Sequence, residues 1–156
     1  MGKQKNPTLY YPMVGFHFQV EFKDMGNKGL DVNFQSVTGL EATIDVETIK
    51  EGGENRFEHG LPGRTKYASL NLKRGALTSN ESAVTQWCIH AFRDNLVRPV
   101  DLTITLLGQQ HQPLVVWEVI HAWPKSWKFN ELNAEKGEVF LETLELQYNR
   151  FEAKPA

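Results

Sequence analysis

The stretch EGGENRFEHGLPGRTK, from Glu51 to Lys66, places four glycines among charged residues. Glycines beside Lys or Arg can form a loop whose backbone amides hold a phosphate group. This stretch lacks the G-x-x-x-x-G-K-[ST] spacing of such loops, and no helical pattern follows it directly to offer an N-terminus to an anion. We therefore interpret it as a polar segment that docks on another surface, and not as a phosphate loop.

The residue types that form metal centres and nucleophilic sites are scattered along the chain. The five histidines show no H-E-x-x-H spacing, and Cys88 is the single cysteine, without a C-x-x-C partner. Cys88 and His90 stand two positions apart, which is about 200° around a helix, so they would face away from one another. The sequence predicts no catalytic group, no metal ligand and no cofactor.

Carboxylates and aromatic rings leave two alternatives to weigh. Asp45 with Glu47, and Glu138 with Glu142, would each share a strand face; a solvated face explains them better than a glycosidase-like site. The four tryptophans could stack nucleobases, but they fall mostly on apolar faces without interleaved Lys or Arg. We expect them in the core or in subunit contacts. A small β-barrel binding protein or an enzyme is the more distant alternative.

The composition is that of a globular protein. The 156 residues are 40% hydrophobic and 23% charged, and this length suits one domain over 1–156. A net charge of -2 gives no general attraction to nucleic acid or to an anionic membrane. No window approaches the roughly 20 apolar residues of a spanning helix, and no signal-peptide run opens the chain. We expect synthesis in the bacterial cytoplasm and no membrane insertion.

Alternation of apolar and polar residues predicts mostly strands. Residues 1–12 are polar and form an N-terminal arm, and from Val14 onward Phe16, Phe18, Val20 and Phe22 share one face of a half-buried strand. Further strands are predicted at 31–37, within 38–51, and at 66–75, 100–107, 114–123 and 139–151. Pro124 is expected to end the strand before it, with an irregular connection over 125–138.

One segment has a helical period. Apolar residues recur at i, i+3, i+4, i+7 and i+8 from Val84, which predicts an amphipathic helix over about 79–95, with Thr78 or Asn80 as its N-cap. The fold class is therefore mainly β, with two antiparallel sheets forming a sandwich or barrel and one helix. The residues expected to pack its core are Phe16, Phe18, Trp87, Phe92, Trp117 and Trp123.

The sequence resembles a known family in motifs that span 14–151. FQSVTGLEATIDVETIKEGGENRFEHGLPGRTKYASLNLKRG is similar to the tail tube proteins of contractile-tailed phages and of phage-derived contractile injection systems. The family pattern is V-x-G-L, then G-G, then L-P-G, then a strand ending in K-R-G. After it, Trp87, VVWEVIHAWP and ETLEL stand in the family's order.

The resemblance implies a structural subunit. It implies a two-sheet β-barrel with one helix, assembled as hexameric rings that stack into a hollow tube for cargo or DNA. The implied partners are further copies of the chain, contractile sheath subunits, the baseplate hub or spike, and tube-terminating cap proteins. The implied location is a phage tail or a tail-like injection particle. The alternative within the family is the initiator ring that joins the tube to the spike.

The resemblance also implies a long extended arm at 41–66 that reaches neighbouring subunits. A polar segment interrupted by glycines becomes ordered when a partner supplies the contacts that its own domain lacks. Phe57 and Leu61 would be its apolar anchors. The residues expected at these contacts are Gly52, Gly53, Phe57, Leu61, Pro62, Gly63 and Arg64.

Overall fold

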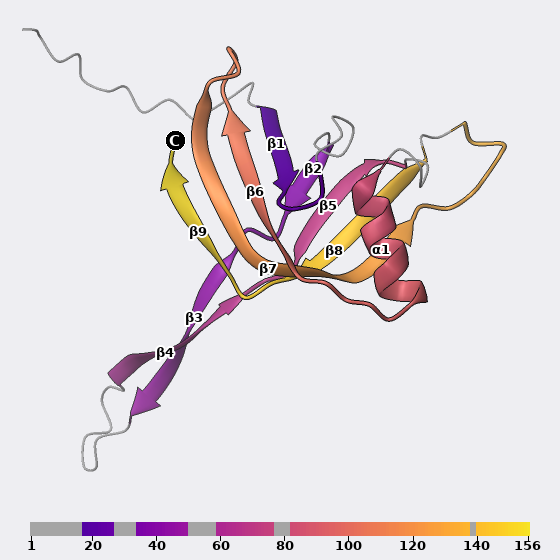
Figure 1. The fold of residues 1–156 in the computed structure, drawn as a ribbon. Helices are drawn as coiled ribbons and strands as arrows, with labels where there is room; N and C mark the ends of the chain where they lie inside the picture. Colours follow the sequence, from indigo (N-terminus) through magenta and orange to yellow (C-terminus); the bar gives the residue numbers. More distant parts are fainter. Residues whose placement is uncertain (1–16, 27–33, 50–58, 77–81, 138–139) are drawn as a thin grey trace, which may run out of the picture.

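Strands dominate the protein (Figure 1). The computed structural model describes residues 17–26, 34–49, 59–76, 82–137 and 140–156. Seven strands form one antiparallel sheet in the order β1–β6–β7–β8–β5–β2, with β9 also paired to β7. They are β1 His17–Phe22, β2 Ser36–Thr38, β5 Leu70–Gly75, β6 Val100–Leu107, β7 Pro113–Phe129, β8 Leu141–Gln147 and β9 Arg150–Pro155. The mainly β prediction is confirmed.

The long strand β7 joins the two halves of this sheet. Its first part pairs with β6 and β9, and its part from Trp123 onward pairs with β8. Register shifts interrupt both ladders near the junction, and His121 has a φ of 61°. Bulges of this kind bend a strand and increase its twist. The backbone N–H of His121 donates to Asp101 Oδ1 at 2.9 Å, so a side-chain carboxylate satisfies this N–H at the interruption.

The two halves contribute to a single core. Along β1, Val20 and Phe22 are buried while His17, Gln19 and Glu21 are exposed, which is the predicted period of two. The core residues of the other sheet strands are Leu70, Leu72, Val100, Leu102, Ile104, Val119, Ala122, Leu144 and Leu146. The helix α1, Ala83–Arg93, adds Val84, Trp87 and Cys88 from its buried side. The described strands do not close into a barrel, because β1 and β2 end the sheet without pairing to each other.

Three predicted boundaries were wrong. β7 continues through Pro124 to Phe129; Pro124 stands opposite Leu146, and the register shifts directly after it, and a bulge is one of the places where a sheet tolerates proline. The single strand predicted over 139–151 is two, β8 and β9, with Tyr148 and Asn149 between them. The helix starts at Ala83 and not near 79, because Ser82 is its N-cap and accepts from the Thr85 N–H at 3.1 Å. Thr78 and Asn80 lie outside the described residues.

Gly39 sets the direction in which the chain leaves β2. Its φ is +96°, and a Cβ there would lie 2.0 Å from the backbone oxygen of Ser69. No side chain fits that approach, so the glycine of the V-x-G-L motif is required by geometry. The carbonyl of Gly39 also accepts from the Tyr148 hydroxyl at 3.3 Å. These contacts of Gly39 set the direction in which the chain leaves the sheet toward the next strand.

Candidate assembly surfaces

The segment after Gly39 forms a hairpin that projects from the body of the molecule (Figure 1). β3, Ala42–Ile49, pairs antiparallel with β4, His59–Tyr67, and neither strand joins the seven-stranded sheet. The predicted arm at 41–66 is thus built, in its described part, as a two-stranded ribbon. A lone two-stranded hairpin is marginal in water, so its stability calls for a further contact.

The two faces of this hairpin differ in character. Ile44, Val46 and Pro62 share one face, where Ile44 is 55% and Val46 is 70% exposed. The opposite face carries Asp45, whose carboxylate lies 2.8 Å from Lys66 Nζ, and also Leu61, which stands opposite Glu47 in register. Apolar side chains as exposed as Ile44 and Val46 are typical of a surface that is covered by a partner. We refer to the face of Ile44, Val46 and Pro62 as the hairpin apolar face.

The predicted contact residues lie partly in this hairpin. Leu61, Pro62, Gly63 and Arg64 all belong to β4, and Leu61 is 43% exposed. Gly63 stands at a register shift, where a Cβ would lie 3.0 Å from the backbone oxygen of Asp45, so the L-P-G motif places glycine at a close approach. Gly52, Gly53 and Phe57 lie outside the described residues.

Sequence reasoning missed Ile44 and Val46 as contact residues. Their alternation with Thr43, Asp45 and Glu47 was visible, but alternation is equally typical of a strand packed on its own core. What the sequence does not show is that, among the described residues, β3 pairs only with β4 and has no further sheet beneath it. The exposure of these two side chains is therefore a finding of the structure.

The residues expected in the core are placed as follows. Trp87 is 5% exposed, and its ring lies 5.8 Å from that of Phe22. Phe18 and Trp117 are half-buried against the core, Trp123 is half-buried, and Phe16 lies outside the described residues. Phe92 corrects the prediction, because it is 46% exposed. Phe92 lies at the edge of the buried side of α1. Its ring stacks on that of Trp127, with centroids 6.4 Å apart.

A buried ion pair connects the sheet to the helix. Arg74 of β5 and Glu142 of β8 stand opposite each other in register, and Arg74 Nε donates to Glu142 Oε1. The same guanidinium donates to the hydroxyls of Ser82 at 2.7 Å and Thr85 at 3.1 Å, at the start of α1. Glu142 is 4% exposed, so the expected solvated face was wrong for it. The K-R-G motif here supplies a structural arginine.

Cys88 and His90, the side chains considered for a thiol–imidazole pair, do not contact each other. Burial, and then the nearby Glu142 carboxylate, raise the pKa of the Cys88 thiol to about 12, so the thiolate is scarce at neutral pH. His90 Nδ1 lies 3.0 Å from Asp94 Oδ2 at the exposed end of the helix, away from the buried Cys88. Hydrogen bonds from Arg93 and then from His90 lower the pKa of Asp94 to about 2.

Metal sites and membrane-spanning helices are both absent from the described part of the chain. No three His, Cys, Asp or Glu side chains there gather where they could hold a metal ion. No helix among those residues is long and apolar enough to cross a membrane.

The fold is shared with components of contractile injection particles. A chain of the anti-feeding prophage baseplate is 29% identical, with 93% of this chain and 97% of that chain covered and a TM-score of 0.81. A chain of the anti-feeding prophage tube-terminating cap is 24% identical over 99% and 98%, with a TM-score of 0.80. A chain of the sheath–tube complex of an extracellular contractile injection system, PVC, is 23% identical over 95% of both, with a TM-score of 0.78.

The sequence itself defines the family. Residues 14–152 match the family of the T4-like virus tail tube protein gp19. The chain therefore belongs to this tail tube protein family, as its motifs indicated. Among curated protein sequences no match is found.

Proposed function

We propose that the protein is a structural subunit of the inner tube of a contractile injection system or contractile phage tail. Copies would join as hexameric rings, and the rings would stack into a hollow conduit for cargo or DNA. The observation that carries the proposal is the projecting hairpin of a tail tube family member. It exposes Ile44 and Val46 where the described residues of its own chain provide no cover.

The free edges of the sheet support the same assembly. β1 and β2 each pair on one side within the described residues, and such edges pair readily with strands of another chain. Edge-to-edge joining of neighbouring copies would close one sheet around a lumen. The remaining proposed partners are the sheath around the tube, the baseplate hub or spike at one end and the cap at the other.

A structural role without catalysis is part of the proposal. It is supported by the family and by the positions of the reactive groups: Cys88 is buried, and Glu142 is paired with Arg74 inside the protein. A ring at the end of the tube is the second candidate, favoured by the similarity to a baseplate chain at 29% identity. Both roles require the same ring-forming contacts.

Replacing Val46 with Asp should abolish assembly and leave the fold intact. Val46 is 70% exposed, so the folded chain tolerates the charge, whereas a subunit contact would bury it. Loss of the apolar contact alone weakens each interface by about 1.5–3 kcal/mol. Sedimentation velocity should show monomers in place of rings or tubes, with an unchanged far-ultraviolet circular dichroism spectrum.

Thr43→Asp is the matched control for this substitution. Thr43 is exposed on the same strand but faces the opposite side, where Asp45 and Lys66 already lie. We expect it to assemble like the unmodified protein. Val46→Asp rings and tubes that match those of Thr43→Asp would contradict the role of the hairpin.

A further inference from the structure

Four aromatic rings form a continuous row on the surface near the end of β7. Phe92 of α1 stacks on Trp127, the ring of Trp127 lies 5.0 Å from that of Phe129, and Phe129 stacks on Phe140 at 5.4 Å. We refer to these four residues as the aromatic ladder. Phe92, Phe129 and Phe140 are 46%, 46% and 41% exposed, so the ladder presents a large apolar area to solvent.

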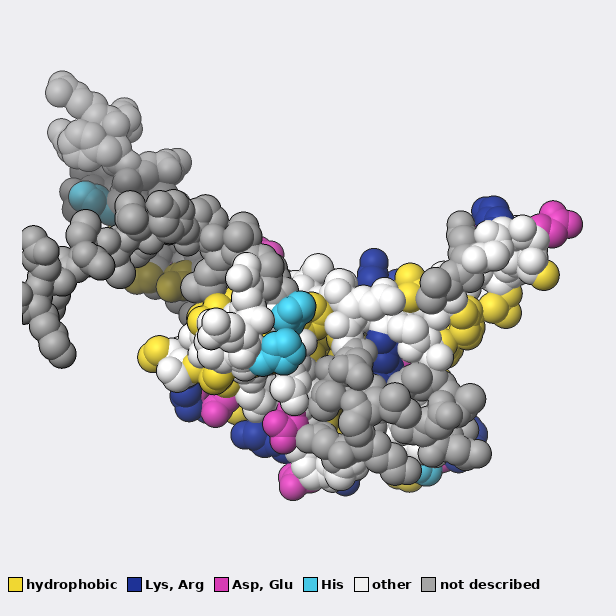
Figure 2. All heavy atoms as spheres, turned by 90° about the horizontal axis from the view of Figure 1, so that it is seen from above, with side chains coloured by type: hydrophobic (Ala, Val, Ile, Leu, Met, Phe, Trp, Pro, Cys, Tyr) yellow, Lys and Arg dark blue, Asp and Glu magenta, His cyan; other side chains and the backbone are white. Residues whose placement is uncertain are grey.

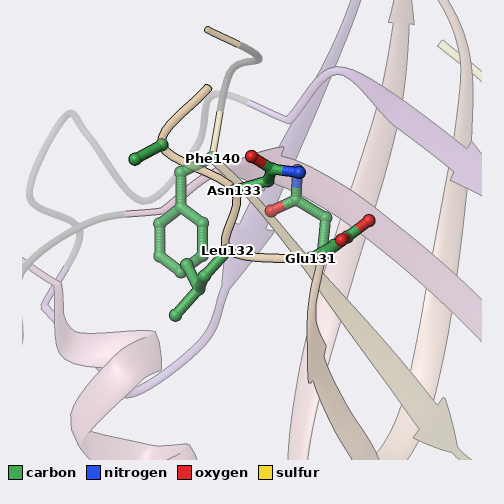
Figure 3. A pocket seen from close by; sticks show the side chains of 6 residues that line it. Glu131, Leu132, Asn133 and Phe140 are labelled. Atoms are coloured by element: carbon green, nitrogen blue, oxygen red, sulfur yellow. The ribbon is translucent and has the colours of Figure 1, made fainter. Parts of the chain in front are cut away.

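The ladder ends in a hollow that is lined by the connection from β7 to β8. Its volume is about 380 Å³, and its lining is Asn130, Glu131, Leu132, Asn133, Ala134 and Phe140. Figure 3 shows the Leu132 side chain beside the Phe140 ring, with Glu131 pointing away from both. Leu132 is 80% exposed, so it extends the exposed apolar area of the ladder into a contiguous patch, which is typical of an interaction surface. Figure 2 shows hydrophobic side chains gathered at this end of the molecule.

The large exposed hydrophobic side chains of the described residues fall into two regions. One is the hairpin, with Ile44, Val46, Ile49 and Leu61. The other runs from the end of α1 to the β7–β8 connection, with Phe92, Leu96, Val97, Phe129, Leu132 and Phe140. Figure 1 shows the hairpin and this connection at opposite ends of the molecule, so a chain's hairpin does not reach its own hollow.

We propose that the hollow and the aromatic ladder receive the hairpin apolar face of a second copy of this chain. This inference rests on the proposed function and names the acceptor surface for the hairpin. A contact between opposite ends of identical chains is heterologous, and such contacts repeat from copy to copy to build rings or stacks. An isologous contact between two hairpins would stop at a dimer.

The charges on the two surfaces do not oppose the contact. The hairpin apolar face is uncharged, because Asp45 and Lys66 pair on the opposite face. Glu131 is the charged residue of the hollow's lining, and its Oε2 lies 3.6 Å from Lys136 Nζ, so this carboxylate has a cationic partner. Neither surface offers an unbalanced charge that would have to be buried, and the rim charges remain in water. The hollow has room for branched aliphatic side chains such as those of Ile44 and Val46.

Cross-linking of two variants that each add one exposed cysteine tests this contact. Val46→Cys and Leu132→Cys are mixed in equal amounts under assembling conditions and treated with a bismaleimide on a flexible spacer. The native Cys88 is 1% exposed, so the unmodified protein serves as the blank. We expect a covalent dimer from the mixture, none from either variant alone, and a ladder of multimers from the double variant.

Gln110→Cys is the control acceptor, at the exposed turn between β6 and β7 and away from the hollow. Particles that form without a link between positions 46 and 132, or that link 46 to 110 instead, would overturn this inference while leaving the tube role intact. The aromatic ladder would then be free for a different protein, such as a sheath subunit. A dimer from Val46→Cys alone would show an isologous hairpin contact and would also overturn it. If no mixture forms rings or tubes, the proposed function itself fails.

Discussion

Replacing Glu142 with Leu should lower the free energy of unfolding by about 3–5 kcal/mol, because one partner of a buried ion pair is removed. Arg74 is 2% exposed and would keep its charge without a carboxylate beside it. The Trp127 indole would also lose its acceptor, Glu142 Oε2, at 3.1 Å. Chemical unfolding at equilibrium measures the loss directly.

Two further variants separate the charge from the packing. Glu145→Leu removes a carboxylate from the same strand, but that carboxylate pairs with the half-exposed Lys125 at 3.5 Å, so we expect a loss below about 1 kcal/mol. Arg74→Met combined with Glu142→Leu should recover much of the stability, since no unpaired charge remains. If Glu142→Leu and Glu145→Leu lower the free energy of unfolding equally, the buried ion pair contributes no more to stability than the exposed one.

Trp87→Ala should remove about 3–5 kcal/mol of stability through the cavity that it leaves. Trp87 is 5% exposed, contacts Phe22, and donates from Nε1 to the Arg98 carbonyl at 2.7 Å. For a chain of this length the melting temperature should fall by more than about 6 °C. Calorimetry is the direct measurement.

Phe92→Ala is the matched control on the same helix. Its ring is 46% exposed, so its truncation should have a markedly smaller effect on melting. Because Phe92 belongs to the aromatic ladder, the same variant should weaken assembly more than folding. If Trp87→Ala shifts the melting temperature by a degree or two, the packing of α1 on the sheet is not as described.

The period of two predicted most of the strands because alternation reports local burial. It identified the inward side of β1, where Val20 and Phe22 are buried. It could not place Glu142, whose burial depends on the register that sets it opposite Arg74. That register arises from pairing between segments 68 residues apart, which no local pattern contains.

The candidate site was predictable in part. The motifs identified the family and the segment that projects, and Leu61, Pro62, Gly63 and Arg64 do lie on the hairpin. The sequence could not show that Ile44 and Val46 face solvent, because exposure depends on which strands have a sheet beneath them. The sequence could not predict the aromatic ladder either, because Phe92, Trp127 and Phe140 are far apart in the sequence and come together only in the folded chain.

Electron microscopy of the purified, unmodified protein tests the central claim most directly. The account predicts rings with a central opening, and stacks of such rings that form hollow tubes at higher protein concentration. Six-fold symmetry in averaged end views would match the proposed hexamer. A chain that stays monomeric at every concentration, and remains so when mixed with sheath and baseplate proteins, would contradict the account.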